Sequence, residues 1–220
     1  MQFQNILFDL DGTLTDPKMG ITQAVQYALT RFDIVEDNLD NLESFIGPPL
    51  AVSFAEFYGF SELDCKKAVE YYREYFADKG LYENEVYAGI LELLQLLVNQ
   101  QRTLIVATSK PTVFAEKIMQ HFGMAPYFKH IYGSNLDGTR SDKGEIIQAI
   151  IEENDLDKSR TIMIGDRKYD IIGAFKNDIA TIAVEYGYGS HEELLNSKPT
   201  YIVNTVEELK NHFCEEVRMK

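Results

Sequence analysis

Short apolar runs recur along the chain and predict the strands of a β-sheet. They cover residues 5–8, 103–107, 130–132, 161–164, 180–184 and 201–203. The runs are largely continuous rather than alternating with polar residues. Such runs are typical of parallel strands that are covered on both faces.

Patterns with the period of an α-helix separate these runs. They cover residues 113–122, 146–151 and 206–217. From about residue 86 onward helix and strand alternate, which is the order of an open α/β sheet with helical crossover connections. The sequence therefore predicts a Rossmann-like α/β domain with an open parallel sheet, formed by residues 1–14 and 86–220.

Residues 15–85 interrupt this alternation and contain no run that predicts a strand. Apolar positions between residues 21 and 32 follow a helical spacing, Gly-Pro-Pro follows at 47–49, and a tyrosine-rich helix is predicted for 61–77. Open α/β sheets bind ligands beyond the carboxyl ends of their strands. An all-helical insert directly after the first strand is therefore expected to cover such a site.

Two carboxylates, Asp9 and Asp11, follow the first predicted strand, and Gly12 then allows a sharp turn. Burying two like charges together is costly unless a cation or a proton lies between them. The pair therefore indicates a divalent metal ion, a shared proton or both. A solvated acidic turn is the alternative.

Residues 9–14 read DxDGTL and resemble motif one of the haloacid dehalogenase superfamily in its phosphatase form. The resemblance implies that Asp9 is the nucleophile and Asp11 the general acid/base. It also implies phosphate-ester chemistry, because dehalogenases and phosphonate hydrolases of the superfamily lack the second aspartate.

Three later segments match the remaining motifs in the order that the superfamily has them, each at a predicted strand end. They imply phosphate-binding roles for Thr108, Ser109 and Lys143, and they place Asp166 and Asp170 in the GDxxxD form of motif four. Each segment alone is a weak signal, since a helix N-cap, a solvated lysine or an acidic helix start would account for it. Their common order supports the assignment.

The resemblance further implies a Mg²⁺ ion held by Asp9, by the backbone carbonyl of Asp11 and by Asp166. Asp170 would act on it directly or through a water. Hard oxygen ligands are what Mg²⁺ prefers. The expected activity is a magnesium-dependent phosphomonoesterase that hydrolyses a small phosphorylated metabolite through an aspartyl-phosphate intermediate.

Residues 45–50, which read FIGPPL, resemble the loop of the small helical cap in the phosphoglycolate-phosphatase-like group, whose members also include 5′-nucleotidases. The 35 positions from Thr108 to Lys143 are too few for the larger cap of other branches. This loop and Lys18 are therefore candidates for contacts to the leaving group. A helix break without a substrate role is an equal alternative for the loop.

Two other activities use the same scaffold. A phosphosugar mutase resembling β-phosphoglucomutase would use Asp9 and Asp11 but transfer the phosphoryl group to a sugar hydroxyl. A non-catalytic binding module would have lost one of the four acids, and this chain keeps all of them.

Two further segments resemble known motifs without completing them. The tetrapeptide Leu-Asp-Gly-Thr recurs at residues 136–139, but Asn135 stands where Asp9 precedes the first copy, so a turn beside the site is expected. Gly187 and Gly189 lack the third glycine of a dinucleotide-binding loop.

Composition limits the partners and the compartment. Asp and Glu number 35 against 21 Lys and Arg, a net charge of −14, so bulk attraction to nucleic acid or to an anionic membrane is not expected. Cys65 and Cys214 form no CxxC motif and are expected to be reduced thiols. With no signal-peptide pattern at the start, we expect a cytoplasmic protein that is a monomer or a weak homodimer.

Overall fold

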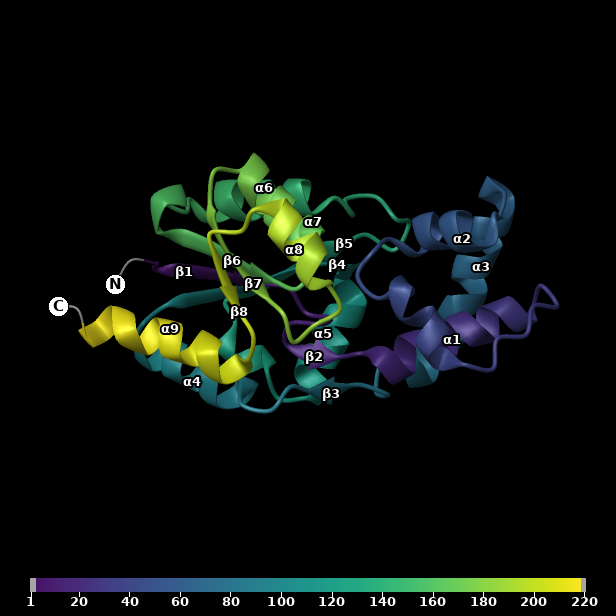
Figure 1. The fold of residues 1–220 in the computed structure, drawn as a ribbon, viewed down its shortest axis with the longest axis horizontal. Helices are drawn as coiled ribbons and strands as arrows, with labels where there is room; N and C mark the ends of the chain where they lie inside the picture. The colour runs from purple at the N-terminus through teal and green to yellow at the C-terminus, as the bar shows by residue number, and fades with distance from the viewer. Residues whose placement is uncertain (1–2, 219–220) are drawn as a thin grey trace. The chain divides into compact units, whose positions relative to one another are not determined.

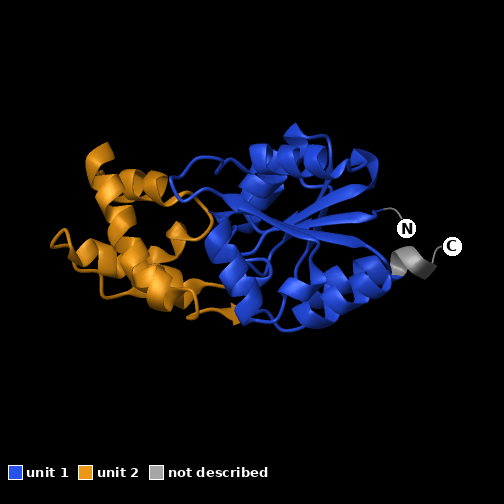
Figure 2. Ribbon diagram, turned by 180° about the vertical axis from the view of Figure 1, so that it is seen from behind, with its two compact units in different colours: residues 1–15, 86–220 blue, residues 16–85 orange. Residues whose placement is uncertain are grey.

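The computed structural model describes residues 3–218, with side chains as far as residue 214. These residues form two compact units (Figures 1 and 2). Unit 1 extends to Thr15 and resumes at Val86, and unit 2 is Asp16–Glu85. The outermost residues of the predicted α/β domain, 1–2 and 219–220, lie outside the described residues.

Unit 1 is built on a six-stranded parallel sheet with the order β5-β4-β1-β6-β7-β8. Each predicted strand is present, so the predicted α/β fold with an open parallel sheet is confirmed. β1 lies between β4 and β6 and is buried along its whole length. The strands are β1 (Asn5–Phe8), β4 (Thr103–Pro111), β5 (His130–Ser134), β6 (Thr161–Gly165), β7 (Ala180–Val184) and β8 (Tyr201–Val203).

Three strands continue past their apolar runs. β4 extends to Pro111, β5 to Ser134 and β6 to Gly165. Hydrophobic patterning does not reveal these extensions, because the carboxyl ends of strands in open α/β sheets carry the polar, ligand-facing residues. The extension of β4 places Thr108 and Lys110 within the sheet.

Helices cover both faces of this sheet. In Figure 1, α6, α7 and α8 lie on one side, where α7 packs against both others, and α4 lies with α9 on the opposite side. α8 was not predicted, because its seven residues are too few to show a helical period. The helices are α4 (Ile90–Asn99), α5 (Thr112–His121), α6 (Lys143–Asn154), α7 (Lys168–Lys176), α8 (His191–Ser197) and α9 (Val206–Arg218), with short 3₁₀ helices at Ala125–Tyr127 and Lys158–Arg160.

The core of unit 1 fixes the position of β1 relative to α6. In the sheet register Leu7 lies level with Ile105 of β4 and Met163 of β6, and all three are fully buried. They pack in one cluster with Ile146 and Ile150 of α6. Because each such side chain contributes about 1.5–3 kcal/mol when it is buried, the start of α6 is held firmly beside the end of β1.

Unit 2 is helical between its two ends. The predicted break at residues 47–49 immediately precedes α2, and the predicted tyrosine-rich helix is α3, which passes into a π turn. Its elements are α1 (Lys18–Thr30), a 3₁₀ helix (Leu39–Phe45), α2 (Leu50–Tyr58), α3 (Glu62–Tyr75) and the π turn (Phe76–Gly80).

The expectation that residues 15–85 contain no strand is wrong at the two ends of this segment. β2 (Thr15–Asp16) and β3 (Glu85–Val86) pair in a two-stranded sheet. Two residues are too few to produce an alternating pattern, so hydrophobic patterning does not reveal either strand.

Aromatic rings form the core of unit 2. The rings of Phe45 and Phe54 lie 5.0 Å apart and those of Phe54 and Phe60 lie 5.8 Å apart, with both Phe45 and Phe54 buried. Each such ring pair contributes about 0.5–1.5 kcal/mol of stability beyond that gained from the area that it buries. These contacts join the 3₁₀ helix to α2 and to the segment that precedes α3.

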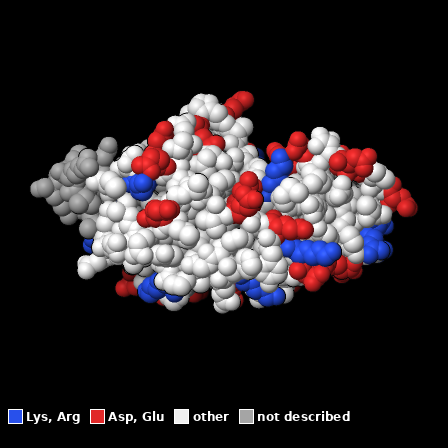
Figure 3. All heavy atoms as spheres, turned by 90° about the horizontal axis from the view of Figure 1, so that it is seen from below, with Lys and Arg blue, Asp and Glu red and all other residues white. Residues whose placement is uncertain are grey.

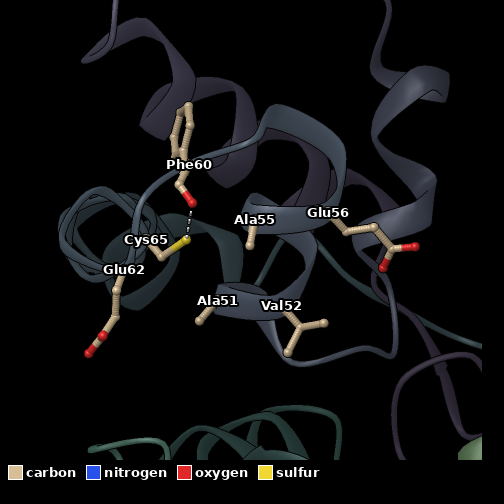
Figure 4. A pocket seen from close by; sticks show the side chains of 7 residues that line it. All are labelled: Ala51, Val52, Ala55, Glu56, Phe60, Glu62 and Cys65. Atoms are coloured by element: carbon tan, nitrogen blue, oxygen red, sulfur yellow. Dashed lines mark hydrogen bonds between the residues drawn. The ribbon is translucent and has the colours of Figure 1, made fainter.

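A pocket of about 620 Å³ opens on unit 2 between α2 and α3 (Figure 4). Cys65 lies in it and contacts the carbonyl oxygen of Phe60 through its thiol, and both Cys65 and Cys214 are free. The pocket contains none of the aspartates that the motifs single out. Its lining residues are Ala51, Val52, Ala55, Glu56, Phe60, Glu62 and Cys65.

Acidic side chains are spread over the face shown in Figure 3, with basic side chains scattered among them rather than gathered in one patch. Among the helices of the described residues, none combines the length and the apolar character that a membrane span requires.

Candidate active site

The loop after β1 holds Asp9 and Asp11 at the end of the central strand. The backbone N–H of Asp9 donates to the carbonyl of Ile164 at 2.9 Å, so Asp9 is still fixed to the sheet. Gly12 then takes a φ of 78°, which a residue with a side chain rarely adopts. Asp9 and Asp11 are only 6% and 9% exposed. The solvated acidic turn considered from the sequence is therefore excluded.

Lys143 joins the ends of three segments. Its ammonium lies 2.9 Å from Oδ1 of Asp9 and 2.8 Å from Oδ1 of Asp170, and it donates to the carbonyl of Ala107 at 2.9 Å. It is the first residue of α6, whose N-cap Asp142 accepts from Glu145. Lys143 is therefore the helix-opening lysine that the sequence predicted, and it is buried rather than solvated.

Asp9, Asp166 and Asp170 form an acidic cluster. Each offers a carboxylate oxygen, and these oxygens lie within 4.8 Å of one another. Asp166 is the residue after β6, and Asp170, in the first turn of α7, also accepts from the backbone N–H of Arg167. The three residues are 6%, 1% and 0% exposed, so solvent screens their mutual repulsion poorly.

Asp11 lies outside that cluster and contacts a lysine that the sequence analysis did not assign a role. Nζ of Lys110 is 2.8 Å from Oδ2 of Asp11, and both side chains are almost fully buried. The available signal was the position of Lys110 two residues after Thr108, which puts both on one face of an extended strand. Ending the predicted strand at residue 107 hid that relation.

The two hydroxyl residues predicted to bind phosphate lie beside Lys110 in β4. Thr108 is 2% exposed, and its Oγ1 accepts from the backbone N–H of Lys110 at 3.2 Å. Ser109 donates to the carbonyl of Ser141 at 3.0 Å, which ties β4 to the loop preceding α6. Phosphate binding by either residue stays a prediction.

Three glycines enclose Asp166, and the sequence analysis had assigned no role to two of them. A Cβ at Gly12 would lie 2.2 Å from Oδ2 of Asp166, and one at Gly189 would lie 2.0 Å from its carbonyl oxygen. A Cβ at Gly187 would lie 2.4 Å from the carbonyl oxygen of Gly12. The backbone N–H of Tyr188 donates to Oδ2 of Asp166 at 2.8 Å. The segment that fails as a dinucleotide-binding loop therefore holds Asp166 in place.

The charges of the site do not balance. Four buried carboxylates, on Asp9, Asp11, Asp166 and Asp170, face the two ammonium groups of Lys110 and Lys143. Arg167 is nearby but forms its own ion pair with Glu193. Fully ionised, the six groups carry two net negative charges, which matches one divalent cation. Oxygen ligands of this kind suit Mg²⁺, so the residues present fit the metal that the sequence analysis expected.

Burial sets the protonation of these groups in the absence of a cation. It raises the pKa of Asp166 well above the usual range, with Asp170 and Asp9 adding to the effect. It raises the pKa of Asp11 as well, although Lys110 acts in the opposite direction. It raises the pKa of Asp170 to about 6 against the opposing effect of Lys143. Burial alone would lower the pKa of Lys143, but Asp170 and Asp9 outweigh it and raise that pKa.

The leaving-group candidates of unit 2 are engaged within that unit. Lys18 forms ion pairs with Asp40, at 2.7 Å, and with Glu43. In the loop at residues 45–50, Ile46 is fully buried and Gly47 takes a φ of 103°. A contact to the leaving group by Lys18 or this loop stays a prediction.

The second Leu-Asp-Gly-Thr copy forms an exposed turn after β5, as expected. Oδ1 of Asp137 accepts from the backbone N–H of Thr139 at 2.9 Å, and the side-chain amide of Asn135 donates to the hydroxyl of Thr139. Residues 135–139 of this turn are exposed, whereas Asp9 and Asp11 of the first copy are buried.

Comparison with known proteins places these observations in a family context. The chain matches the family of haloacid dehalogenase-like hydrolases over residues 6–184. It is 52% identical to a 5′-nucleotidase of Pseudomonas aeruginosa over 201 residues, 91% of each chain. It is 32% identical to the tyrosine-protein kinase PtkA of Mycobacterium tuberculosis over 209 residues, 94% of this chain and 71% of that protein. A crystal structure described as that of a predicted phosphatase from Clostridium acetobutylicum superposes with a TM-score of 0.94 at 49% identity, covering 98% of this chain and 100% of the other.

The raised pKa of Asp170 predicts a pH-dependent stability without divalent cations. Asp170 titrates near 3.8 in the unfolded chain and near 6 in the folded one. The folded protein therefore holds this proton more tightly, and the associated stability is present below about pH 4 and lost as the pH rises through about 6.

Chemical unfolding in EDTA at pH 4 to 7 tests this, with Asp170→Asn as the reference. The difference between the unfolding free energies, wild type minus Asp170→Asn, should fall by about 2–3 kcal/mol as the pH rises from 4 to 7. A difference that does not change with pH would contradict the expected titration.

The glycine enclosure predicts that Gly189→Ala weakens Mg²⁺ binding. The new Cβ would displace Asp166, and disturbing groups that hold metal ligands typically costs about 10–100-fold in metal affinity. The measurement is the Mg²⁺ concentration that half-saturates the thermal stabilisation. Gly123→Ala is the control for a general loss of stability, because its φ of 69° disfavours alanine while the space around its Cβ position is open. Equal half-saturation in both variants would refute the positional role of Gly189.

Proposed function

Because the chain belongs to the haloacid dehalogenase-like hydrolases and hydrolyses phosphoric monoesters, we propose that it is a magnesium-dependent phosphatase of small phosphorylated metabolites. The observation that carries the proposal is the buried cluster in which Lys143 contacts both Asp9 and Asp170. A nucleophilic carboxylate, an acidic metal site and a fixed ammonium are what phosphoryl transfer requires.

Asp9, Asp166 and Asp170 would hold the Mg²⁺, with the backbone carbonyl of Asp11 as a further ligand. The ion, when bound, neutralises charge on the transferring phosphoryl group. Lys143, which contacts Asp9, supplies a second positive charge, and Thr108 supplies a hydroxyl. These residues would orient the phosphoryl group.

Asp9 has one oxygen that is already engaged. Its Oδ1 accepts from the backbone N–H of Leu10 at 2.7 Å and contacts Lys143 at 2.9 Å. The other oxygen, Oδ2, is therefore the nucleophile in this proposal. It bonds to phosphorus as the bond from phosphorus to the leaving oxygen breaks, and protonated Asp11 gives its proton to that oxygen.

Hydrolysis of the aspartyl phosphate completes the cycle. A water bonds to phosphorus, its proton passes to Asp11, and the bond from phosphorus to Asp9 breaks. Inorganic phosphate leaves, Asp9 is again a carboxylate, and Asp11 is again protonated. The raised pKa of Asp11 suits a group that must be a proton donor in one step and an acceptor in the next.

Nucleoside 5′-monophosphates are the substrates that we propose first. The relative at 52% identity is named a 5′-nucleotidase, and the match covers 91% of this chain. Phosphoglycolate is the second choice, from the resemblance of residues 45–50. We also propose that unit 2 is the cap, since it is inserted at Asp16, a few residues after Asp9 and Asp11.

Transfer to a hydroxyl instead of water is the competing activity. One relative is named a tyrosine-protein kinase, and the phosphosugar mutase considered from the sequence would also use a hydroxyl acceptor. The phosphatase and the mutase would share Asp9 and Asp11, and the kinase is the third outcome. The product distinguishes them: inorganic phosphate for a phosphatase, a phosphate isomer for a mutase, and phosphotyrosine for a kinase.

Phosphate release from nucleoside 5′-monophosphates, phosphoglycolate and glucose 1-phosphate, measured with Mg²⁺, tests the proposal. Release should be fastest from a nucleoside monophosphate, and Asp9→Asn should lower kcat by at least about 10⁴-fold because the nucleophile is lost. Asp137→Asn, in the exposed second copy, should leave kcat unchanged. Full activity of Asp9→Asn would overturn the mechanism, and an isomer formed from glucose 1-phosphate without release of phosphate would overturn the choice of water as acceptor.

A further inference from the structure

Lys110 is buried at the end of β4, where a charged side chain needs a specific partner. Its side chain is 5% exposed, and its ammonium lies 2.8 Å from Oδ2 of Asp11. Burying an ammonium costs several kcal/mol, so this pair is retained against a substantial penalty. Lys143, the other buried lysine of the site, contacts Asp9 and Asp170 instead.

This contact makes the two oxygens of Asp11 unequal. Oδ2 is held by Lys110, whereas Oδ1 is buried and has no hydrogen-bond partner among the described residues. A buried oxygen without a partner is costly and calls for an explanation. A leaving oxygen or a water at the site would be such a partner.

We propose that Lys110 is a positioning residue, which holds Asp11 by Oδ2 so that Oδ1 is the atom that passes the proton. This inference rests on the proposed phosphatase mechanism. In the first step the bond between Oδ1 and its proton breaks as the leaving oxygen takes the proton and separates from phosphorus. In the second, Oδ1 takes the proton of the attacking water.

The backbone of β4 keeps Lys110 in place for this role. Its N–H donates to Oγ1 of Thr108, and a Cβ at Gly133 of the neighbouring strand would lie 2.3 Å from its carbonyl oxygen. These contacts fix the backbone of Lys110 next to Thr108 in β4. Because a side chain on a packed strand moves little, the direction of Oδ1 is fixed before substrate binds.

A role limited to charge balance makes a different prediction. An ammonium that only offsets the charge of Asp11 would affect all substrates alike when removed. If the ammonium directs the proton of Asp11, its removal should slow the reaction most for substrates whose leaving oxygen needs that proton. Alkyl leaving groups need it, whereas 2,4-dinitrophenolate leaves readily without it.

The test compares Lys110→Met with the wild type on an alkyl phosphate and on 2,4-dinitrophenyl phosphate. General acid catalysis contributes about 10²–10⁴-fold. We therefore expect kcat/KM to fall by at least about 10²-fold for the alkyl ester and by less than about tenfold for the aryl ester. Lys117→Met, on the exposed side of α5, is the matched control and should change neither. Equal losses for the two esters would overturn the proposal.

A double-mutant comparison covers the case in which Lys110→Met does not fold. Removing both partners of a buried ion pair is far less destabilising than removing one, so Asp11→Asn/Lys110→Met is compared with Asp11→Asn. If Lys110 acts through Asp11, the two variants should cleave the aryl ester at rates within about threefold. A further loss of tenfold or more would show that Lys110 acts on the phosphoryl group directly and would overturn the proposal.

The Asp9→Asn variant separates this inference from the proposed function. Suppose that Asp9→Asn is inactive on both esters and that Lys110→Met lowers kcat/KM equally for both. Then only the role of Lys110 is wrong. If Asp9→Asn is active, the phosphatase mechanism itself fails, and the inference fails with it.

Discussion

Four carboxylates and two ammonium groups are buried together at the carboxyl ends of the central strands. The resulting excess of two negative charges governs both the chemistry of the site and the packing around it. At low exposure such an excess cannot be solvated, so it must be offset by protons or by a cation. The raised pKa values of Asp11, Asp166 and Asp170 are the first of these responses. A bound divalent ion is the second, and it would favour the ionised forms of the acids that hold it, Asp9, Asp166 and Asp170.

The fold holds these charges together because unrelated segments end at one edge of one sheet. The loop after β1 carries Asp9 and Asp11, β4 carries Lys110, and the start of α6 carries Lys143. The apolar cluster around Leu7 fixes the two strands and the helix relative to one another. The position of the Asp166 carboxylate is set by the backbone of the glycines that enclose it, which can approach closely because glycine has no side chain. Stability supplied by the core thus offsets the cost of burying these charges.

The sequence predicted the sheet, the helical segment and the acidic residues for identifiable reasons. Continuous apolar runs mark buried strands, and the order of the four motifs marks Asp9, Lys143 and Asp166. Lys110 and Gly189 were missed because their importance lies in contacts across long sequence separations. Neither interrupts a pattern: a lysine after an apolar run reads as the end of a strand, and two glycines read as a loop. The two-residue strands β2 and β3 were missed because they are shorter than any period.

Anomalous diffraction from a crystal soaked in Mn²⁺, a stand-in for Mg²⁺ that is visible by its scattering, tests the charge argument most directly. We expect one strong peak per chain within about 2.5 Å of carboxylate oxygens of Asp9 and Asp166, with Asp170 adjacent. A peak elsewhere in the chain, or an empty cluster at saturating Mn²⁺ and neutral pH, would contradict it.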